Sequence, residues 1–240
     1  MFRARFLSLV VVVLLLAGCS VPFTTQLSGS GPAVTKDYDL ARFTAVAAGS
    51  AFEVEITRSD KYSVSVTVNE NLVERLDVGI SGDTLRIYLK PGIRITGNAT
   101  LKANVTLPEL TGLDLSGASN TTLAGFESGK ALQSKVSGAS TLRGDLTCGD
   151  ARFDASGASK VDLKGGAQGL NVTASGASTV DLGSFSSKDT VVDASGASRV
   201  NVAPGGSLDV EASGASTVRY VGEPARLKVN TSGASTVGQK

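Results

Sequence analysis

The sequence predicts an all-β protein, a single-stranded parallel β-helix with about 19 residues in each coil. Three observations support this prediction. The tetrapeptide Ser-Gly-Ala-Ser (SGAS) occurs seven times after residue 110, at intervals of 18 to 21 residues, and self-similarity at such a period is typical of a solenoid. Apolar and polar residues alternate on both sides of each copy, as they do in strands. The chain also contains 28 glycines and no long amphipathic segment, which disfavours a helical domain.

The SGAS motif is expected to form a corner between strands. Glycine adopts positive φ at little cost, so the second residue of the motif can turn the chain. The alanine is expected to point inward, where the bend leaves little room, and the serines to bond to nearby backbone groups or to one another in ladders. This structural role accounts for the whole motif, so repeated catalytic serines are not indicated. The seven expected corner glycines are Gly117, Gly138, Gly157, Gly176, Gly196, Gly214 and Gly233.

Alignment of the seven copies gives two apolar columns that are expected to line the core. Stacked strands lie about 4.8 Å apart, and a coil of this length suits three short strands with corners. Connections between parallel strands are right-handed in most folds, so we expect a right-handed coil. The column three residues before the first serine holds Leu113, Ser134, Phe153, Val172, Val192, Val210 and Val229, and the column five residues after it holds Thr121, Leu142, Val161, Val180, Val200, Val218 and Val237.

The region before the repeats, residues 37–110, alternates in the manner of strands but has no fixed period. Its segments AFEVEIT and YSVSVTV exchange apolar and polar residues at every position. We interpret it as a less regular N-terminal β region that caps a β-helix domain spanning 37–240, with the seven repeats at 111–240. No capping helix follows the last coil, so its open edge is expected to pair with a second copy or another partner.

The N-terminus carries the features of a lipoprotein signal. Residues 1–18 combine two arginines, an apolar run and the start of the tetrapeptide LAGC, which is typical of a bacterial lipobox with Cys19 as the lipidated residue. Residues 19–36 lack hydrophobic periodicity, so a flexible tether is predicted. We therefore expect a lipid-anchored protein of the bacterial envelope, and Ser20 after the cysteine favours the outer membrane. Cys148 is left without a disulfide partner and is expected to be a small buried residue.

Composition and charge exclude several functions. The 23 basic and 22 acidic residues provide no basic excess for a nucleic-acid surface. Because the chain has no histidine, a Ser-His-Asp triad and an HExxH zinc site are both impossible. Asp162 and Asp181 are candidates for a calcium site or an acid–base pair, since stacking would place them about 5 Å apart. The alternative is a solvated surface balanced by Lys160, Lys164 and Arg199, and no cofactor is expected.

Three features of the chain resemble one known family. They are the repeated SGAS motif, the segment that begins FTAVAAGSAFEVEIT, and the joint NVTLPELTGLDLSGAS, and together they cover residues 38–240. They are similar to the auto-transporter adhesin head GIN domain family. The resemblance implies a β-helix behind a lipoprotein signal in a bacterial envelope, a role in adhesion, and no established catalytic residues.

Two functions follow from these expectations. The first is a non-catalytic, lipid-anchored envelope protein that presents a rigid β-helix to a protein or glycan partner, for adhesion or envelope assembly. The alternative is a polysaccharide-binding or polysaccharide-cleaving β-helix protein that uses the column of Asp162 and Asp181.

Overall fold

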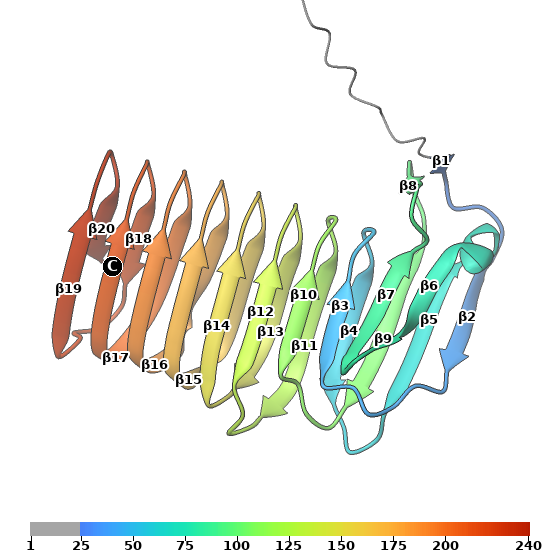
Figure 1. Ribbon diagram of the computed structural model, residues 1–240, viewed down its shortest axis with the longest axis horizontal. Coiled ribbons are helices and arrows are strands. Elements are labelled where there is room, and N and C mark those ends of the chain that lie inside the picture. The colour runs from blue at the N-terminus through green and yellow to red at the C-terminus, as the bar shows by residue number, and fades with distance from the viewer. Residues whose placement is uncertain (1–24) are drawn as a thin grey trace, which may run out of the picture.

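The chain folds into one long β-solenoid in which parallel strands stack coil upon coil (Figure 1). This computed structural model describes residues 25–240, so the predicted signal peptide 1–18 and Cys19 lie outside the described residues. Strands make up most of the described part, with one short 3-10 helix, η1 (Glu70–Arg75). The predicted all-β solenoid is confirmed.

Two parallel stacks of strands, called face 1 and face 2, run along the solenoid. Face 1 consists, in order, of β7 (Thr84–Leu89), β3 (Ala45–Ala48), β10 (Gly112–Leu115), β12 (Leu132–Val136), β14 (Asp150–Ala155), the second halves of β15 (Lys160–Ala174), β16 (Thr179–Ala194) and β17 (Arg199–Ala212), and β19 (Arg226–Thr231). Face 2 consists of β9 (Leu101–Leu107), β4 (Glu53–Arg58), β11 (Asn120–Glu127), β13 (Thr141–Thr147), the first halves of β15, β16 and β17, β18 (Thr217–Tyr220) and β20 (Thr236–Gln239).

The register between coils follows the alignment of the SGAS copies. Val161, Val180 and Val200 are successive partners on face 2, and Val172 and Val192 are partners on face 1. Each coil contains two strand runs, one per face, and not the three short strands that its length suggested. In β15, β16 and β17 a single strand continues around the corner opposite SGAS, and its pairing with the next coil shifts register on the way, between Asp162 and Lys164 in β15 and between Asp181 and Ser186 in β16.

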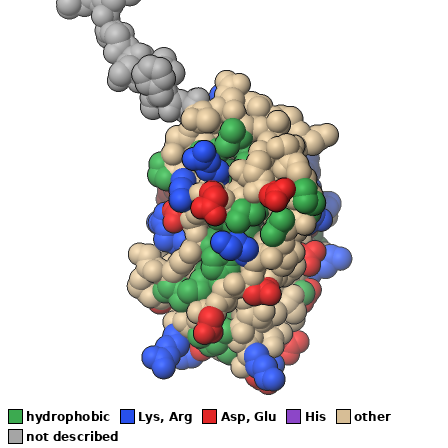
Figure 2. All heavy atoms as spheres, turned by 90° about the vertical axis from the view of Figure 1, so that its right-hand side faces the viewer, with side chains coloured by type: hydrophobic (Ala, Val, Ile, Leu, Met, Phe, Trp, Pro, Cys, Tyr) green, Lys and Arg blue, Asp and Glu red, His purple; other side chains and the backbone are tan. Residues whose placement is uncertain are grey.

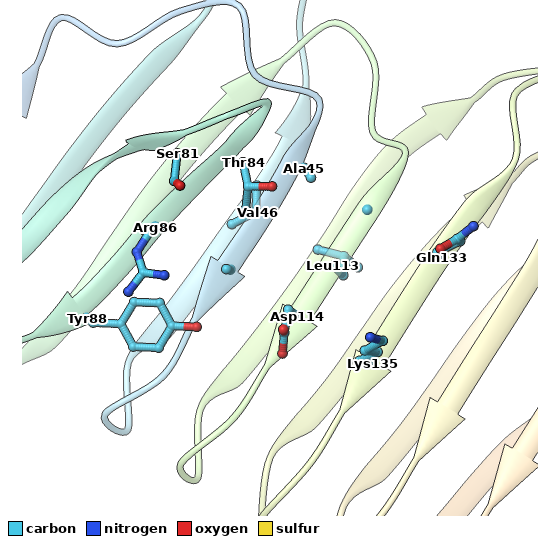
Figure 3. A pocket seen from close by; sticks show the side chains of 12 residues that line it. Ala45, Val46, Ser81, Thr84, Arg86, Tyr88, Leu113, Asp114, Gln133 and Lys135 are labelled. Carbon is cyan, nitrogen blue, oxygen red and sulfur yellow. The ribbon is translucent and has the colours of Figure 1, made fainter.

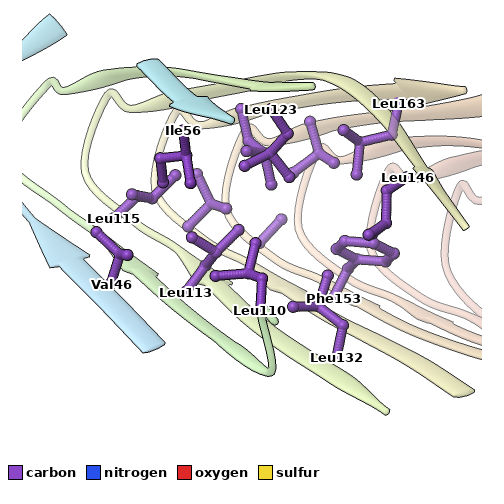
Figure 4. Close-up of a cluster of buried hydrophobic side chains, with 14 of the residues drawn as sticks. Val46, Ile56, Leu110, Leu113, Leu115, Leu123, Leu132, Leu146, Phe153 and Leu163 are labelled. Atoms are coloured by element: carbon purple, nitrogen blue, oxygen red, sulfur yellow. The ribbon is translucent and has the colours of Figure 1, made fainter. Parts of the chain in front are cut away.

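Inward side chains of the two faces form one continuous apolar core. Figure 4 shows Val46 and Leu113 of face 1 on the opposite side of the core from Ile56 of face 2. Further along, the rings of Phe153 and Phe185 pack edge to face with their centroids 6.1 Å apart. Full burial of one such side chain contributes roughly 1.5–3 kcal/mol, so these columns are the main source of stability.

An N-terminal cap closes one end of the solenoid. Here β5 (Ser63–Asn69) pairs antiparallel with β9 and with β2 (Ala33–Tyr38), and β6 (Leu76–Ser81) pairs antiparallel with β7. Phe43, Phe52 and Leu72 are fully buried in this region. The large side chains and the change to antiparallel pairing set the cap apart from the repeats.

The segment predicted as a flexible tether, 19–36, is structured from Thr25 onward, so that prediction was wrong for these residues. β1 (Thr25–Leu27) pairs in parallel with β8 (Ile93–Ile95), and β2 begins at Ala33. Most side chains of β2 are exposed, so it has little alternation of its own. Its place in the sheet comes from its pairing with β5, which the local sequence does not reveal.

All seven motif glycines have positive φ, between 62° and 71°. The alanine of each motif is exposed, and the second serine is buried or half-buried, so the expectation of an inward alanine was wrong. The second serine hydroxyl mostly donates to a backbone carbonyl of an earlier coil, as from Ser198 to Ala174 at 3.3 Å. A direct serine–serine bond joins Ser119 and Ser140 at 3.3 Å. The ladder that repeats along the corner is formed by backbone groups, such as the Ala177 amide donating to the Gly157 carbonyl at 2.7 Å.

Candidate functional site

A groove on the outer surface of face 1 lies where the cap meets the first coils (Figure 3). It has a volume of about 370 Å³ and opens to solvent. Its floor is formed by Ala45 and Ala47 of β3 and by Gly112 of β10. Because these residues are so small, the outward side chains of β7 and β12 stand above them as walls.

The strand register fixes how the walls face one another. One row across β7, β3, β10 and β12 contains Thr84, Ala45, Gly112 and Gln133, and the next contains Arg86, Ala47, Asp114 and Lys135. With strands about 4.8 Å apart, the backbone positions of Arg86 and Asp114 are about 10 Å apart across Ala47. The groove therefore offers both signs of charge beside an uncharged floor.

Tyr88 of β7 gives the groove an aromatic side chain held in place by its neighbours. The Arg86 guanidinium lies 5.1 Å from the centre of the ring, a cation–π distance. Gly49 lies against the ring, and a Cβ added there would be 2.6 Å from the ring carbon Cε1. Burial raises the pKa of the Tyr88 hydroxyl, the charge of Asp114 raises it further, and the hydrogen bond with Ser116 and the charge of Arg86 lower it. The raised pKa extends the pH range over which this hydroxyl stays protonated further into alkaline solution.

Sequence patterning did not reveal this groove. Its residues come from four separate segments, and they meet because β3 pairs with β7 on one side and with β10 on the other. A local signal was nevertheless present in the segment AVAAGS, residues 45–50. Its outward positions 45 and 47 hold alanine, where most strands of the repeats hold polar residues.

Asp162 and Asp181 lie in register on neighbouring strands of face 2, as expected. One carboxylate oxygen of Asp162 is 4.0 Å from the Lys160 ammonium, and one of Asp181 accepts a hydrogen bond of 3.2 Å from the Gly183 amide. Within residues 25–240 no group of three or more His, Cys, Asp or Glu side chains is placed to hold a metal ion. The polysaccharide hypothesis gains no support from this arrangement.

The Cys148 thiol is buried at the start of the link between β13 and β14. Its side chain is 6% exposed, and its sulfur lies 3.8 Å from the Asp150 carbonyl oxygen. Burial raises the pKa of the thiol to about 11, and the charge of Asp150 contributes to the shift. The thiol is therefore protonated at neutral pH, whereas the thiol of a reactive cysteine is partly ionised at that pH.

No helix in the part of the chain that the structure describes is long and apolar enough to cross a membrane. The fold and the groove define a β-solenoid protein with an open surface site on one face. The chain belongs to the family described as "Putative auto-transporter adhesin, head GIN domain", whose model matches residues 42–224. A comparison with curated protein sequences gave no match.

Several solved bacterial structures share the fold. A putative adhesin from Bacteroides fragilis superimposes with a TM-score of 0.83 and 20% identity, covering 89% of this chain and 100% of that one. A putative lipid binding protein from Parabacteroides distasonis superimposes with a TM-score of 0.70 and 17% identity, covering 90% of this chain and 100% of that one. A putative adhesin from Parabacteroides merdae superimposes with a TM-score of 0.67 and 16% identity, covering 90% of this chain and 99% of that one. At these identities the similarity establishes the fold alone.

Proposed function

We propose that this protein is a non-catalytic contact module of the bacterial cell envelope, anchored by lipid at Cys19 in the outer membrane. It presents a rigid solenoid for adhesion or for assembly of the envelope, and its partner is a protein or a glycan. The observation that carries the proposal is the groove over β3, a preformed open site on a rigid scaffold. Membership of an adhesin family supports the same function.

The groove suits an extended chain that runs along β3. The small floor of Ala45, Ala47 and Gly112 allows close approach of a backbone or a sugar ring. Arg86 and Lys135 on opposite walls can then donate to its acceptors, and Asp114 can accept from its donors. Paired strands hold these walls at fixed distances, so little conformational entropy is lost on binding.

A binding assay with paired double variants tests the groove. Two labelled variants are titrated onto isolated bacterial envelopes beside the wild type. The groove variant is Arg86→Ala/Lys135→Ala, and the control is Arg199→Ala/Arg219→Ala, which removes two exposed arginines from face 2. We expect the groove variant to lose at least about tenfold in affinity, since residues central to a contact commonly contribute 1 kcal/mol or more each, and the control to bind like the wild type. Equal binding by the two variants would remove the groove from the proposal.

Lipid attachment is tested separately on the full-length chain. Expressed in a bacterium with two membranes, the wild type is expected to incorporate labelled palmitate and to fractionate with the outer membrane. The Cys19→Ser variant is expected to do neither. Incorporation of label by this variant, or wild-type protein that stays free of lipid, contradicts the anchor.

We also propose that the last described coil can pair with a second copy of the chain. Leu227 and Val229 of β19 continue the inward column of Leu208 and Val210, yet they are 45% and 39% exposed. Stacking of another coil would bury them in the same way as the earlier coils are buried. Light scattering at increasing concentration is expected to show a dimer, and Val229→Lys is expected to abolish it. A monomer throughout the concentration range refutes self-pairing.

A further inference from the structure

We propose that the N-terminal end of the solenoid docks on an anionic phospholipid surface through Arg75, Lys90 and Arg94, with the solenoid axis directed away from the bilayer. This inference rests on the proposed lipid anchor at Cys19 and adds to it the orientation of the molecule. The groove over β3 and the last coil would then project from the membrane at defined heights.

The start of the described chain is fixed to the cap and is not free to swing. The Thr25 amide donates to the Gly92 carbonyl at 2.7 Å, and the Thr96 amide donates to the Leu27 carbonyl at 2.8 Å. Only five residues lie between Cys19 and Thr25, which gives six Cα-to-Cα steps, so the lipid can lie at most about 20 Å from β1. An anchor at this position holds the β1–β8 ribbon close to the headgroups.

The three basic residues gather around this ribbon and are all exposed. Arg94 occupies the middle of β8 beside Gln26 of β1, while Ile93 and Ile95 on either side pack partly against the core. Alternation therefore directs Arg94 outward. Lys90 and Arg75 are adjacent because the Lys90 amide donates to the Arg75 carbonyl at 2.8 Å. Figure 2 views this end of the molecule and shows basic side chains in its upper part.

The charges of these residues are available to a ligand. None of the ion pairs formed within residues 25–240 involves Arg75, Lys90 or Arg94, although Glu74 and Asp77 lie in the same region. Each basic residue beside an anionic surface favours binding about fivefold, so three of them favour docking on the order of a hundredfold. Phospholipid headgroups are the anionic groups that a lipid anchor brings within reach.

The dimensions of the solenoid restrict the other orientations. Ten strand-to-strand steps lead from β2 in the cap to β20 in the last coil, which gives about 48 Å at 4.8 Å per step. A link of about 20 Å cannot bring the last coil to the bilayer while the cap faces away from it. Upright docking through the cap and lying flat are the two remaining arrangements.

The test anchors the protein chemically, so that it does not depend on lipidation in cells. The chain from Cys19 onward is coupled to maleimide-bearing lipid in vesicles of phosphatidylcholine, with or without phosphatidylglycerol. Coupling is selective for Cys19 because Cys148 is buried. Hydrogen–deuterium exchange is then measured for the wild type, for Arg75→Gln/Lys90→Gln/Arg94→Gln, and for the control Arg219→Gln/Arg226→Gln/Lys240→Gln. The control removes three exposed basic residues from the other end.

We expect slower exchange at residues 90–96 on vesicles that contain phosphatidylglycerol than on neutral vesicles. This protection should disappear in the N-terminal variant and in high salt, where charges are screened, and it should persist in the control. Equal protection on both kinds of vesicle overturns the proposal. Loss of protection in the control variant also overturns it, because this result indicates a molecule that lies flat on the membrane. If the palmitate experiment fails while this one succeeds, the cellular anchor is refuted and the docking surface is not.

Discussion

Glycine at the SGAS corner is required for two separable reasons, and three Gly→Ala substitutions distinguish them. At Gly157 φ is +71°, and an added Cβ would stand 2.6 Å from the Gly138 carbonyl oxygen of the preceding coil. At Gly82 φ is +64°, but no atom of residues 25–240 lies within 4 Å of an added Cβ. At Gly129 φ is not positive, and an added Cβ would have no atom of the described residues within 4 Å. The series therefore compares a position with conformational strain and crowding (Gly157), a position with strain alone (Gly82) and a position with neither (Gly129).

The expected losses of stability follow from these geometries. A left-handed conformation costs an L-residue about 1–2 kcal/mol, and the stiffer unfolded chain of the alanine variant returns about 0.4–1 kcal/mol, so Gly82→Ala should cost about 1 kcal/mol. At Gly157 the two corners must also separate, which adds about 1–3 kcal/mol of overpacking and stretches the 2.8 Å bond from the Ala158 amide to the Gly138 carbonyl. We expect a total of about 3 kcal/mol or more for Gly157→Ala. For Gly129→Ala we expect a gain of about 0.4–1 kcal/mol, because no strain offsets the effect of the stiffer unfolded chain.

Thermal unfolding followed by far-UV circular dichroism measures the series. For a domain of this size 1 kcal/mol corresponds to about 2–4 °C in Tm, so Gly157→Ala should lower Tm by on the order of 10 °C and Gly82→Ala by about 3 °C. Equal shifts for the two variants would refute the crowding argument, because both share the positive φ. A large shift for Gly129→Ala would show that loss of glycine is harmful for a reason other than these two.

Three further predictions concern single buried positions. Thr121 has a buried hydroxyl that finds no hydrogen-bond partner among residues 25–240, in a column that elsewhere holds valine or leucine. Thr121→Val should therefore stabilise the protein by about 1–2 kcal/mol in urea unfolding, and lower stability would indicate that the hydroxyl is satisfied. Ser134→Ala should act in the same direction for the same reason, and an unchanged or lower urea midpoint would contradict it. The Cys148 thiol has a pKa of about 11 in the folded state and an ordinary value near 9 when unfolded, so the unfolded chain releases its proton first and stability should fall between pH 9 and pH 11. Cys148→Ala should flatten that part of the pH profile, and an unchanged profile would exclude the thiol as its source.

The repeats were predictable because each coil repeats the same alternation and each copy places glycine at the same corner. The orientation within the motif could also have been obtained from alternation. Ser119 stands two residues before Thr121, which is buried, so continuing the strand pattern backward through the motif places the serine inside and leaves the alanine outside. The small size of alanine did not indicate that its side chain points inward. The alanine is exposed, and the residue for which the neighbouring corner leaves no room for a side chain is the glycine.

The cap and the groove were less accessible because they depend on pairing between distant segments. β2 is an edge strand with mostly exposed side chains, and its partner β5 lies about 30 residues further along the chain. Arg86 and Asp114 share one row of the groove only because β3 pairs with both of their strands. Alternation assigns an element and its buried side chains, but it does not determine which strand of a non-repeating region lies beside which.

The first coil shows that crowding between coils, more than φ alone, selects glycine at the corner. Its turn, residues 49–52, lies beside the first SGAS turn, and the Ala51 amide donates to the Gly117 carbonyl at 3.0 Å. Here Ser50 occupies the position of the glycine, with φ at 55°. The neighbour of Ser50 on the cap side is the end of β7, where the Leu89 amide donates to the Ser50 hydroxyl at 3.2 Å and offsets part of the strain. A side chain is tolerated at positive φ where the preceding coil does not place a glycine corner within contact distance of its Cβ. Gly157→Ala and Gly82→Ala compare a crowded and an uncrowded position of this kind.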